Sequence, residues 1–462
     1  MGIRPTKEQF NRQLEQIAGT LRNEMIEGRY ALGEYLPTER TLMERFRMSN
    51  NAVRTALETL VREGWIEKVP RIGNRVAAGR PPVKLVLARN NVAQRNLELS
   101  GLLDNFHRQF PWISVETHKI DGQGNTGDAD LVMVDNYQFQ SMVEDGAIKK
   151  LEPLTGREDT YPGLARQFVV EGSLYMRPVV FSPIVLCYNK AHFRECGLME
   201  PDGSWTWDNL LDCAEKLSDG KGRYGFSFHA QDMNRWPLFM LQSGERFEWN
   251  AGQLNDLRGT RLLESMKVYK RIIHNRKAFP LFLSESNGDI MQMFEEGKLS
   301  MILNTYMGLN LWKHANLEYD VAPVPFIYEP RTLIIVLGIG ISAKSAHKEE
   351  ARLLADYFVS AGAQNYIYEH TLSIPSTQLP TYSPAASTSV GINRPERYAL
   401  FREMMFSYRT HSDLGIPVMS LPKIFQPLKA YLADMIDENE LCDRIRSALS
   451  DETRAGASEA GD

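Results

Sequence analysis

Residues 36–76 read LPTERTLMERFRMSNNAVRTALETLVREGWIEKVPRIGNRV. Pro37 disfavours helix before it, and Thr38 can cap the helix that follows. Ser49 is a good N-cap for a second helix, so only a very short turn separates the two. The buried positions of both helices are expected at helical spacing: Leu42, Phe46, Val53, Leu57, Leu60 and Val61. This stretch therefore predicts two helices joined by a tight turn.

The flanking residues complete a small domain. Apolar residues recur at helical spacing between Phe10 and Glu27 (Leu14, Ile17, Leu21 and Met25), and Gly28 follows as a stop. Gly64 ends the last helix. The segment WIEKVPRIGNRV, residues 65–76, has two apolar halves around Gly73-Asn74, as in a two-stranded hairpin. Three helices and a hairpin predict a winged helix-turn-helix.

Polar side chains are expected at the N-terminal end of the last helix. Asn50, Asn51 and Arg54 lie off its buried stripe, at the end that a recognition helix inserts into the major groove. Asparagine can bond adenine bidentately, arginine can bond guanine, and the helix dipole favours phosphate nearby. For any one of these residues alone, an ordinary solvated helix cap is an equal alternative.

Residues 10–77 closely resemble the DNA-binding domain of the GntR family of bacterial transcription regulators, through EGRYALGEYLPTERTLMERFRMS, VRTALETLVREGWI and GNRV. The resemblance implies that Arg40 and Arg54 bind phosphates or bases and that Gly73 enters the minor groove. One departure is Ala52, where the family usually has threonine and therefore a hydroxyl near the backbone. The resemblance also implies that Ser49, Asn50 and Asn51 face the groove. Arg71 and Arg75 flank the wing tip and are further phosphate candidates. The candidate DNA-binding residues are therefore Thr38, Arg40, Ser49, Asn50, Asn51, Arg54, Arg71, Gly73 and Arg75. Since such heads commonly read two half-sites, we expect a homodimer on a palindromic operator.

Charge divides the chain unevenly. The 462 residues carry a net charge of -5, yet residues 1–80 contain 14 Lys and Arg against 10 Asp and Glu. Residues 1–80, the head, are basic and the remaining residues, the body, are acidic, which indicates that only the head binds a polyanion. No apolar run reaches the ~20 residues that a membrane-spanning helix needs, and the N-terminus lacks the apolar segment of a secretory signal. The sequence therefore predicts a cytoplasmic protein.

Residues 77–83, AAGRPPV, form a linker after which the pattern changes. VKLVLAR at 83–89, ISVETHKI at 113–120 and ADLVMVD at 129–135 read as strands, with an amphipathic helix after the first. Strand, helix, strand in this order predicts a parallel sheet. Ligands bind beyond the carboxyl ends of such strands. Here those ends carry four polar or aromatic residues: Asn90, Asn91, Asp135 and Tyr137.

The body, about residues 83–450, resembles the family 1 extracellular solute-binding proteins, which deliver sugars to ABC transporters. The resemblance rests on ADLVMVDNYQFQSMVEDGAIKKLEPL, VFSPIVLCYNKAHFRECGL, GSWTWDNLLDCAEKL and FEEGKLSMIL. It implies an α/β fold of two periplasmic-binding-protein-like lobes that close on a ligand. By position in that fold, the candidate ligand-binding residues are Asn90, Asn91, Asp135, Tyr137, Ser182, Tyr188, Trp236, Asn304 and Tyr306. A core aromatic or a loop cap is about as probable for each.

These observations predict a winged head at 1–78, a linker at 79–82, a two-lobed effector domain at 83–450 and a disordered tail at 451–462. The function expected is a transcription regulator whose body senses a sugar or oligosaccharide and alters operator binding. The main alternative is a regulator whose body only dimerises or binds a partner. A transport protein is disfavoured by the missing signal sequence.

Catalysis is not expected. The nine histidines show no HExxH spacing, and GxSxG and GxxxxGK[ST] do not occur. The four cysteines, without CxxC spacing, favour neither a disulfide framework nor zinc. We therefore expect neither a metal nor a cofactor.

Overall fold

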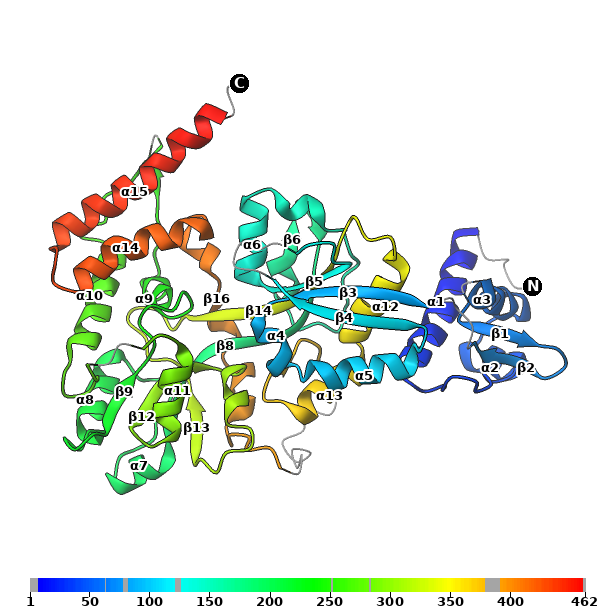
Figure 1. Ribbon diagram of the computed structural model, residues 1–462, viewed down its shortest axis with the longest axis horizontal. Helices are drawn as coiled ribbons and strands as arrows, with labels where there is room; N and C mark the ends of the chain where they lie inside the picture. Colours follow the sequence, from blue (N-terminus) through cyan, green and yellow to red (C-terminus); the bar gives the residue numbers. More distant parts are fainter. Residues whose placement is uncertain are drawn as a thin grey trace.

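The computed structural model describes residues 7–62, 64–77, 82–120, 126–250, 252–281, 284–378 and 391–459. Three parts lie side by side in Figure 1: a small N-terminal head, a central lobe 1, and a lobe 2 that carries the C-terminal helices. Most of the predicted linker, 79–82, lies outside the described residues.

The head contains three helices and one hairpin: α1 (Lys7–Ile26), α2 (Glu39–Phe46), α3 (Asn50–Arg62), β1 (Ile66–Val69) and β2 (Gly73–Val76). The Thr38 hydroxyl accepts the Thr41 backbone N–H at 3.2 Å, and the Ser49 hydroxyl accepts the Ala52 N–H at 3.2 Å. The predicted N-caps of α2 and α3 are therefore confirmed, and with them the short turn between these helices.

Two details of the head differ from the prediction. Gly73 and Asn74 begin strand β2, and the hairpin turns at residues 70–72, where Arg71 adopts a left-handed backbone with φ of 65°. Val61, expected inside, is 37% exposed because it lies beside the buried stripe at the end of α3.

Lobe 1 begins with the parallel strands β3 (Val83–Arg89), β4 (Ile113–Lys119) and β5 (Leu131–Asp135). All three match the strands and the parallel pairing that the sequence predicts. Five helices belong to this lobe: α4 (Asn91–Asn96), α5 (Leu99–Gln109), α6 (Asn136–Glu144), α12 (Lys348–Phe358) and α13 (Ala361–His370).

Two long strands connect the lobes. Strand β8 (Arg177–Asn189) pairs with β14 (Thr332–Ile341) along its first half and with β12 (Leu299–Thr305) along its second half. Among the described residues, ten strands thus form one sheet, with the principal order β4-β3-β5-β14-β8-β12-β9. The two lobes therefore share a single continuous sheet.

Lobe 2 is built around β12, the parallel strand β9 (Tyr224–Ser227) and β13 (Tyr319–Ala322). Its helices are α7 (Lys190–Glu195), α8 (Trp207–Leu217), α9 (Trp236–Leu241), α10 (Arg261–His274), α11 (Asn287–Glu295), α14 (Leu421–Leu432) and α15 (Glu438–Glu459). Apolar side chains in the first part of helix α15 anchor it on lobe 2, and the helix runs on to Glu459, through most of the segment 451–462 for which the sequence predicts a disordered tail. Residues 460–462 lie outside the described residues.

The remaining elements are short. The 3-10 helices are η1 (Ala147–Lys150), η2 (Ala165–Phe168), η3 (Gly308–Leu311), η5 (Tyr398–Arg402), η6 (Met405–Ser407), η7 (His411–Leu414) and η8 (Val418–Ser420). The short strands are β6 (Val169–Val170), β7 (Ser173–Leu174), β10 (Trp249–Asn250), β11 (Gln253–Leu254), β15 (Ile374–Pro375) and β16 (Tyr408–Arg409).

The head packs directly against lobe 1. The Trp65 ring meets the Phe110 ring edge-on at 5.5 Å between centroids, and Phe110 meets Trp112 in the same way at 5.5 Å. The apolar residues of the head and those of α5 and α12 form one continuous buried cluster. A cavity of about 190 Å³ lies at this joint, lined by residues of the head, including Met25, and of lobe 1, including Phe110. The head and lobe 1 are therefore one packed unit (Figure 1).

Candidate DNA-binding surface and ligand site

The residues predicted to contact DNA gather on the outer face of the head. Thr38 and Arg40 lie at the start of α2, Ser49 to Arg54 at the start of α3, and Arg71 and Gly73 at the wing. Eight of the nine are exposed: Thr38, Arg40, Ser49, Asn50, Asn51, Arg54, Arg71 and Gly73. This is the arrangement that a winged helix needs for the start of α3 to enter a major groove. Their contacts with DNA remain predictions.

The arginines of this surface differ in how firmly they are held. Among the described residues, the one carboxylate that Arg54 approaches is that of Glu58, one turn away on α3, at 3.9 Å, and the Arg54 side chain is 58% exposed. Arg75 instead donates its Nε hydrogen to Glu67 across the hairpin at 2.8 Å, and this bond raises the pKa of Arg75. Arg54 can therefore reorient towards a base more easily than Arg75 can.

Ala52 stands where the GntR family usually has threonine, and this difference affects the packing of the head rather than its contact with DNA. Ala52 is fully buried beneath the exposed Asn51 and belongs to the apolar cluster of the head. A side chain at this position cannot reach DNA from the outer face of α3.

A buried charge holds α1 against α2. The Glu24 carboxylate, 5% exposed, receives hydrogen bonds from Arg45, one of them at 2.8 Å, and from Arg29. Burial opposes ionisation of Glu24, but the bonds from Arg45 and Arg29 outweigh it and lower the pKa of this carboxyl. The ion pair thereby fixes the helix that precedes the recognition helix.

The predicted ligand residues of lobe 1 meet at the carboxyl ends of β3 and β5. The Asn90 amide donates to Gln138 at 2.9 Å, and the Gln138 backbone N–H donates to Asp135 at 2.9 Å. Asn90 caps α4 and Asp135 caps α6, whereas Asn91 is exposed on the first turn of α4. Burial raises the pKa of Asp135. The structure thus brings Asn90 and Asp135 together through Gln138.

Lobe 1 touches lobe 2 through α6. The Tyr137 ring meets the His411 ring at 4.9 Å between centroids, and the Tyr137 hydroxyl donates to the Val418 carbonyl at 3.4 Å. The Glu144 carboxylate accepts the backbone N–H groups of Val418 and Met419 at 2.9 and 3.0 Å. These residues define the lobe boundary, where α6 faces η7 and η8.

The other candidates lie inside the sheet. Ser182 and Asn304 are at most 1% exposed, and the Ser182 hydroxyl accepts the Met307 backbone N–H at 3.0 Å. The Tyr306 hydroxyl donates to the Tyr398 carbonyl at 3.0 Å, and the Tyr188 hydroxyl donates to Glu200 at 2.7 Å. Ser182, Tyr306 and Tyr188 therefore already have a bonding role within the protein, whereas Nδ2 of Asn304 has no hydrogen-bond partner among the described residues.

Trp236 lies at the start of α9 and is 1% exposed. Its ring stacks on Phe425 of α14 at 5.3 Å, and its Nε1 hydrogen points to the Met233 sulfur at 3.3 Å. The described contacts of this ring thus join α9 to α14 within lobe 2. Its predicted contact with a ligand remains a prediction.

Sequence reasoning missed two polar residues near the lobe boundary, Arg235 and His411. Both are buried, and each has a nitrogen without a hydrogen-bond partner among the described residues. Arg235 directly precedes the tryptophan that the sequence singled out, but a single arginine in a loop carries no recognisable signal. His411 lies 178 residues from its hydrogen-bond partner Met233, so no local pattern could have joined them.

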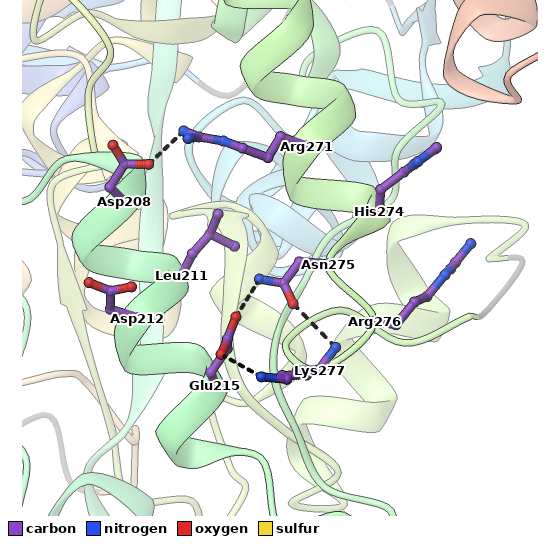
Figure 2. A pocket seen from close by; sticks show the side chains of 9 residues that line it. All are labelled: Asp208, Leu211, Asp212, Glu215, Arg271, His274, Asn275, Arg276 and Lys277. Atoms are coloured by element: carbon purple, nitrogen blue, oxygen red, sulfur yellow. Dashed lines mark hydrogen bonds and ion pairs between the residues drawn. The ribbon is translucent and has the colours of Figure 1, made fainter.

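A separate hollow lies on the outside of lobe 2, between α8 and the end of α10 (Figure 2). Its cavity volume is about 610 Å³. One wall is acidic and the other basic, and the two walls pair with each other: Arg271 reaches Asp208 at 2.5 Å, and Lys277 reaches Glu215 at 3.6 Å. Arg271, Asp208, Lys277 and Glu215 are thus already paired within the protein.

None of the helices in the described ranges is long and apolar enough to cross a membrane. The same residues contain no group of three or more His, Cys, Asp and Glu side chains placed to hold a metal ion.

A winged head packed on two lobes that share one sheet defines a DNA-binding regulator domain joined to a solute-binding domain. The family described as bacterial extracellular solute-binding protein matches residues 116–385, more than half of the chain, and the bacterial regulatory proteins of the gntR family match residues 13–76. The chain belongs to the solute-binding protein family and carries a GntR head. Neither is a family of enzymes.

Individual relatives agree with this assignment. A putative binding protein of Brucella abortus is 27% identical over 240 residues, 49% of this chain and 57% of the relative. The chain thus spans little more than half the length of that relative. The galactooligosaccharide-binding protein of Bacillus subtilis is 22% identical over 307 residues, 63% of this chain and 70% of the relative.

Solved structures share the two-lobed fold. The ABC substrate-binding protein of Listeria monocytogenes in complex with cycloalternan is similar with a TM-score of 0.67, 17% identity, and coverage of 80% of this chain and 99% of that chain. A maltose-bound protein of T. maritima gives a TM-score of 0.67 at 18% identity, with coverage of 80% and 99%. The body therefore shares the two-lobed fold of these two solved structures.

Proposed function

We propose that this protein is a transcription regulator that binds operator DNA through its winged head and a sugar or oligosaccharide between its lobes. Occupancy of the lobes alters operator affinity. The protein acts as a homodimer on two half-sites, and it works in the cytoplasm, because that is where operator DNA lies.

The observation that carries this proposal is the joint between the head and lobe 1. The buried contact of Trp65 with Phe110 makes the DNA-binding head continuous with one half of the binding fold. A ligand that changes how lobe 2 sits on lobe 1 then acts on the part that holds the head. Ligand binding and DNA binding are coupled if the ligand-bound and ligand-free arrangements of the lobes make different contacts with the ligand and with DNA.

The class of ligand is inferred from relatives. The galactooligosaccharide-binding protein and the maltose-bound structure are named for sugars, and their fold is the fold of this body. Asn90, Asp135 and Tyr137 at the ends of the lobe 1 strands supply the amide, carboxylate and ring that hold sugar hydroxyls and faces. We propose that these three contact the ligand.

A second candidate function is a body that assembles the dimer or binds a partner without a ligand. One observation favours it: five predicted ligand residues are at most 1% exposed, namely Ser182, Tyr188, Trp236, Asn304 and Tyr306. The contact of Glu144 with residues 418 and 419 also joins the lobes directly.

Arg54→Ala is expected to weaken operator binding by about 1–3 kcal/mol, or about 5- to 150-fold, because it removes a base or phosphate contact at the start of α3. A gel-shift titration at fixed salt measures this loss. Arg62→Ala is the matched control, because Arg62 is exposed in the last turn of the same helix and bonds Thr59 at 3.3 Å. Equal effects of the two substitutions would contradict a specific role for Arg54.

The first experiment is a thermal-shift screen of the full chain against mono- and oligosaccharides, followed by gel shifts on the DNA upstream of its own gene. A sugar that raises the melting temperature and changes operator affinity is the expected result. Intact DNA binding with no response to any sugar would favour the second candidate function.

A further inference from the structure

Arg235 is a buried cation with little compensation. Its side chain is 3% exposed in the loop between β9 and α9, and its Nε has no hydrogen-bond partner among the described residues. Its nearest carboxylate, Asp232, stands at 4.0 Å. The Asp232 oxygens are already engaged by the Asn234 backbone N–H at 2.6 Å and by the Asn287 amide. A guanidinium stays charged in proteins, so this burial is costly without an anion.

The loop that carries Arg235 lies at the lobe boundary. The Met233 carbonyl accepts the Nε2 hydrogen of His411 at 2.8 Å, and the other side of His411 meets Tyr137 of lobe 1. The loop also follows β9, which runs parallel to β12, so it leaves the sheet at the carboxyl end of these strands. Open α/β sheets bind ligands at this end.

His411 adds a neutral acceptor to the same place. Burial lowers its pKa to about 4, so the imidazole is uncharged at neutral pH. Because Nε2 donates to Met233, Nδ1 carries a lone pair, and it has no partner among the described residues. Asp232 lies within electrostatic range of both His411 and Arg235. A ligand with hydroxyl donors and one anionic group would satisfy both nitrogens.

We propose that the effector is an acidic sugar, in which a carboxylate or phosphate binds Arg235 and a hydroxyl donates to Nδ1 of His411. This rests on the proposed sugar-sensing function and narrows it. Asp232 does not form a hydrogen bond with the buried guanidinium. An anionic group of the ligand would compensate its positive charge and accept its hydrogen bonds. A neutral sugar would satisfy the hydrogen bonds but would leave the cation uncompensated.

The first test needs no ligand. A charged group that awaits a ligand destabilises the empty protein, so Arg235→Met is expected to raise its melting temperature. Arg223→Met is the matched control in the same lobe. The Arg223 side chain is also largely buried, at 16% exposed, but it donates to Glu195 at 2.7 Å and to the Leu217 carbonyl at 3.0 Å. The control is expected to lower the melting temperature. A lowered value for Arg235→Met would overturn the proposal, since Arg235 would then be a structural ion pair.

The second test is calorimetric titration of the full chain with glucose, maltose, glucuronate and glucose 6-phosphate. Glucuronate or glucose 6-phosphate is expected to bind at least about 10-fold more tightly than glucose, and Arg235→Gln is expected to remove this preference. The two acids distinguish a carboxylate effector from a phosphate effector. Tight binding of a neutral sugar, unchanged by Arg235→Gln, would overturn the acidic-ligand inference and leave sugar sensing intact. Binding of none of the four, with a lowered melting temperature for Arg235→Met, would overturn both.

Discussion

Trp65→Ala is expected to lower the free energy of unfolding by about 3–5 kcal/mol, the range for removal of a buried tryptophan side chain. The substitution opens the cavity of about 190 Å³ that already lies beside Trp65 and removes its contact with Phe110. The neighbours Phe110 and Trp112 lie in lobe 1 between α5 and β4, both buried in the same apolar cluster, so they cannot collapse into the space without disturbing these elements. Urea unfolding, monitored by far-UV circular dichroism and not by tryptophan fluorescence, measures the lost free energy of unfolding.

The same substitution is also expected to separate the head from lobe 1. In the wild type the shared core predicts that the two unfold together, whereas in the variant the head should melt in an earlier, separate transition. Phe406→Ala is the control, because the Phe406 side chain is 73% exposed and its loss should leave the transition unchanged. A Trp65→Ala protein with wild-type stability would show that the joint contributes nothing.

Glu24→Gln is expected to cost the head about 2–4 kcal/mol. A broken buried ion pair costs about 3–5 kcal/mol, and the value here is lower because Arg45 is one-third exposed and can regain water. The matched control is Glu44→Gln, which removes an exposed pair with Arg40 on α2 and should cost under about 0.5 kcal/mol. Thermal unfolding of both variants at neutral pH makes the comparison, and equal melting temperatures would contradict a supporting role for Glu24.

The charge of Glu24 also predicts how acid acts on the head. Because its pKa is lowered from the ordinary 4.5, its stabilising contribution is complete above that value and is lost as the pH falls through the lower, folded value. The wild-type melting temperature should therefore drop below about pH 4.5, and Glu24→Gln should show a shallower drop. If the melting temperatures of the two proteins fell in parallel with pH, carboxyl groups other than Glu24 would dominate the acid sensitivity.

Much of the fold could be predicted from local patterns. The caps Thr38 and Ser49 and the strands of lobe 1 follow from residues that act on their immediate neighbours, and the structure confirms them. The turn of the wing was misplaced because Gly73 is a favoured turn residue, yet Arg71 adopts the left-handed backbone in the turn, and Gly73, at a φ of 146°, pairs in the strand.

The contacts that matter most for function could not be predicted in this way. Trp65 and Phe110 each read as an ordinary core residue, and only the packing of two domains shows that they meet. Arg235 and His411 are notable because both are buried and each has a nitrogen without a hydrogen-bond partner among the described residues. No sequence pattern predicts either property. The burial of the candidate ligand residues Ser182, Tyr188, Trp236, Asn304 and Tyr306 could not be foreseen either, and their contact with a ligand stays a prediction.

The joint of Trp65 and Phe110 has a consequence for the DNA rather than for the protein. If each head moves only as part of its lobe 1, the distance between the two recognition helices of a dimer is set by how the two bodies meet. Half-sites of helix-turn-helix dimers repeat at about one turn of DNA, so a shift of the bodies changes the number of base pairs that fits between them. The effector would then select operators by their spacer length, with the sequence of each half-site read in the same way throughout.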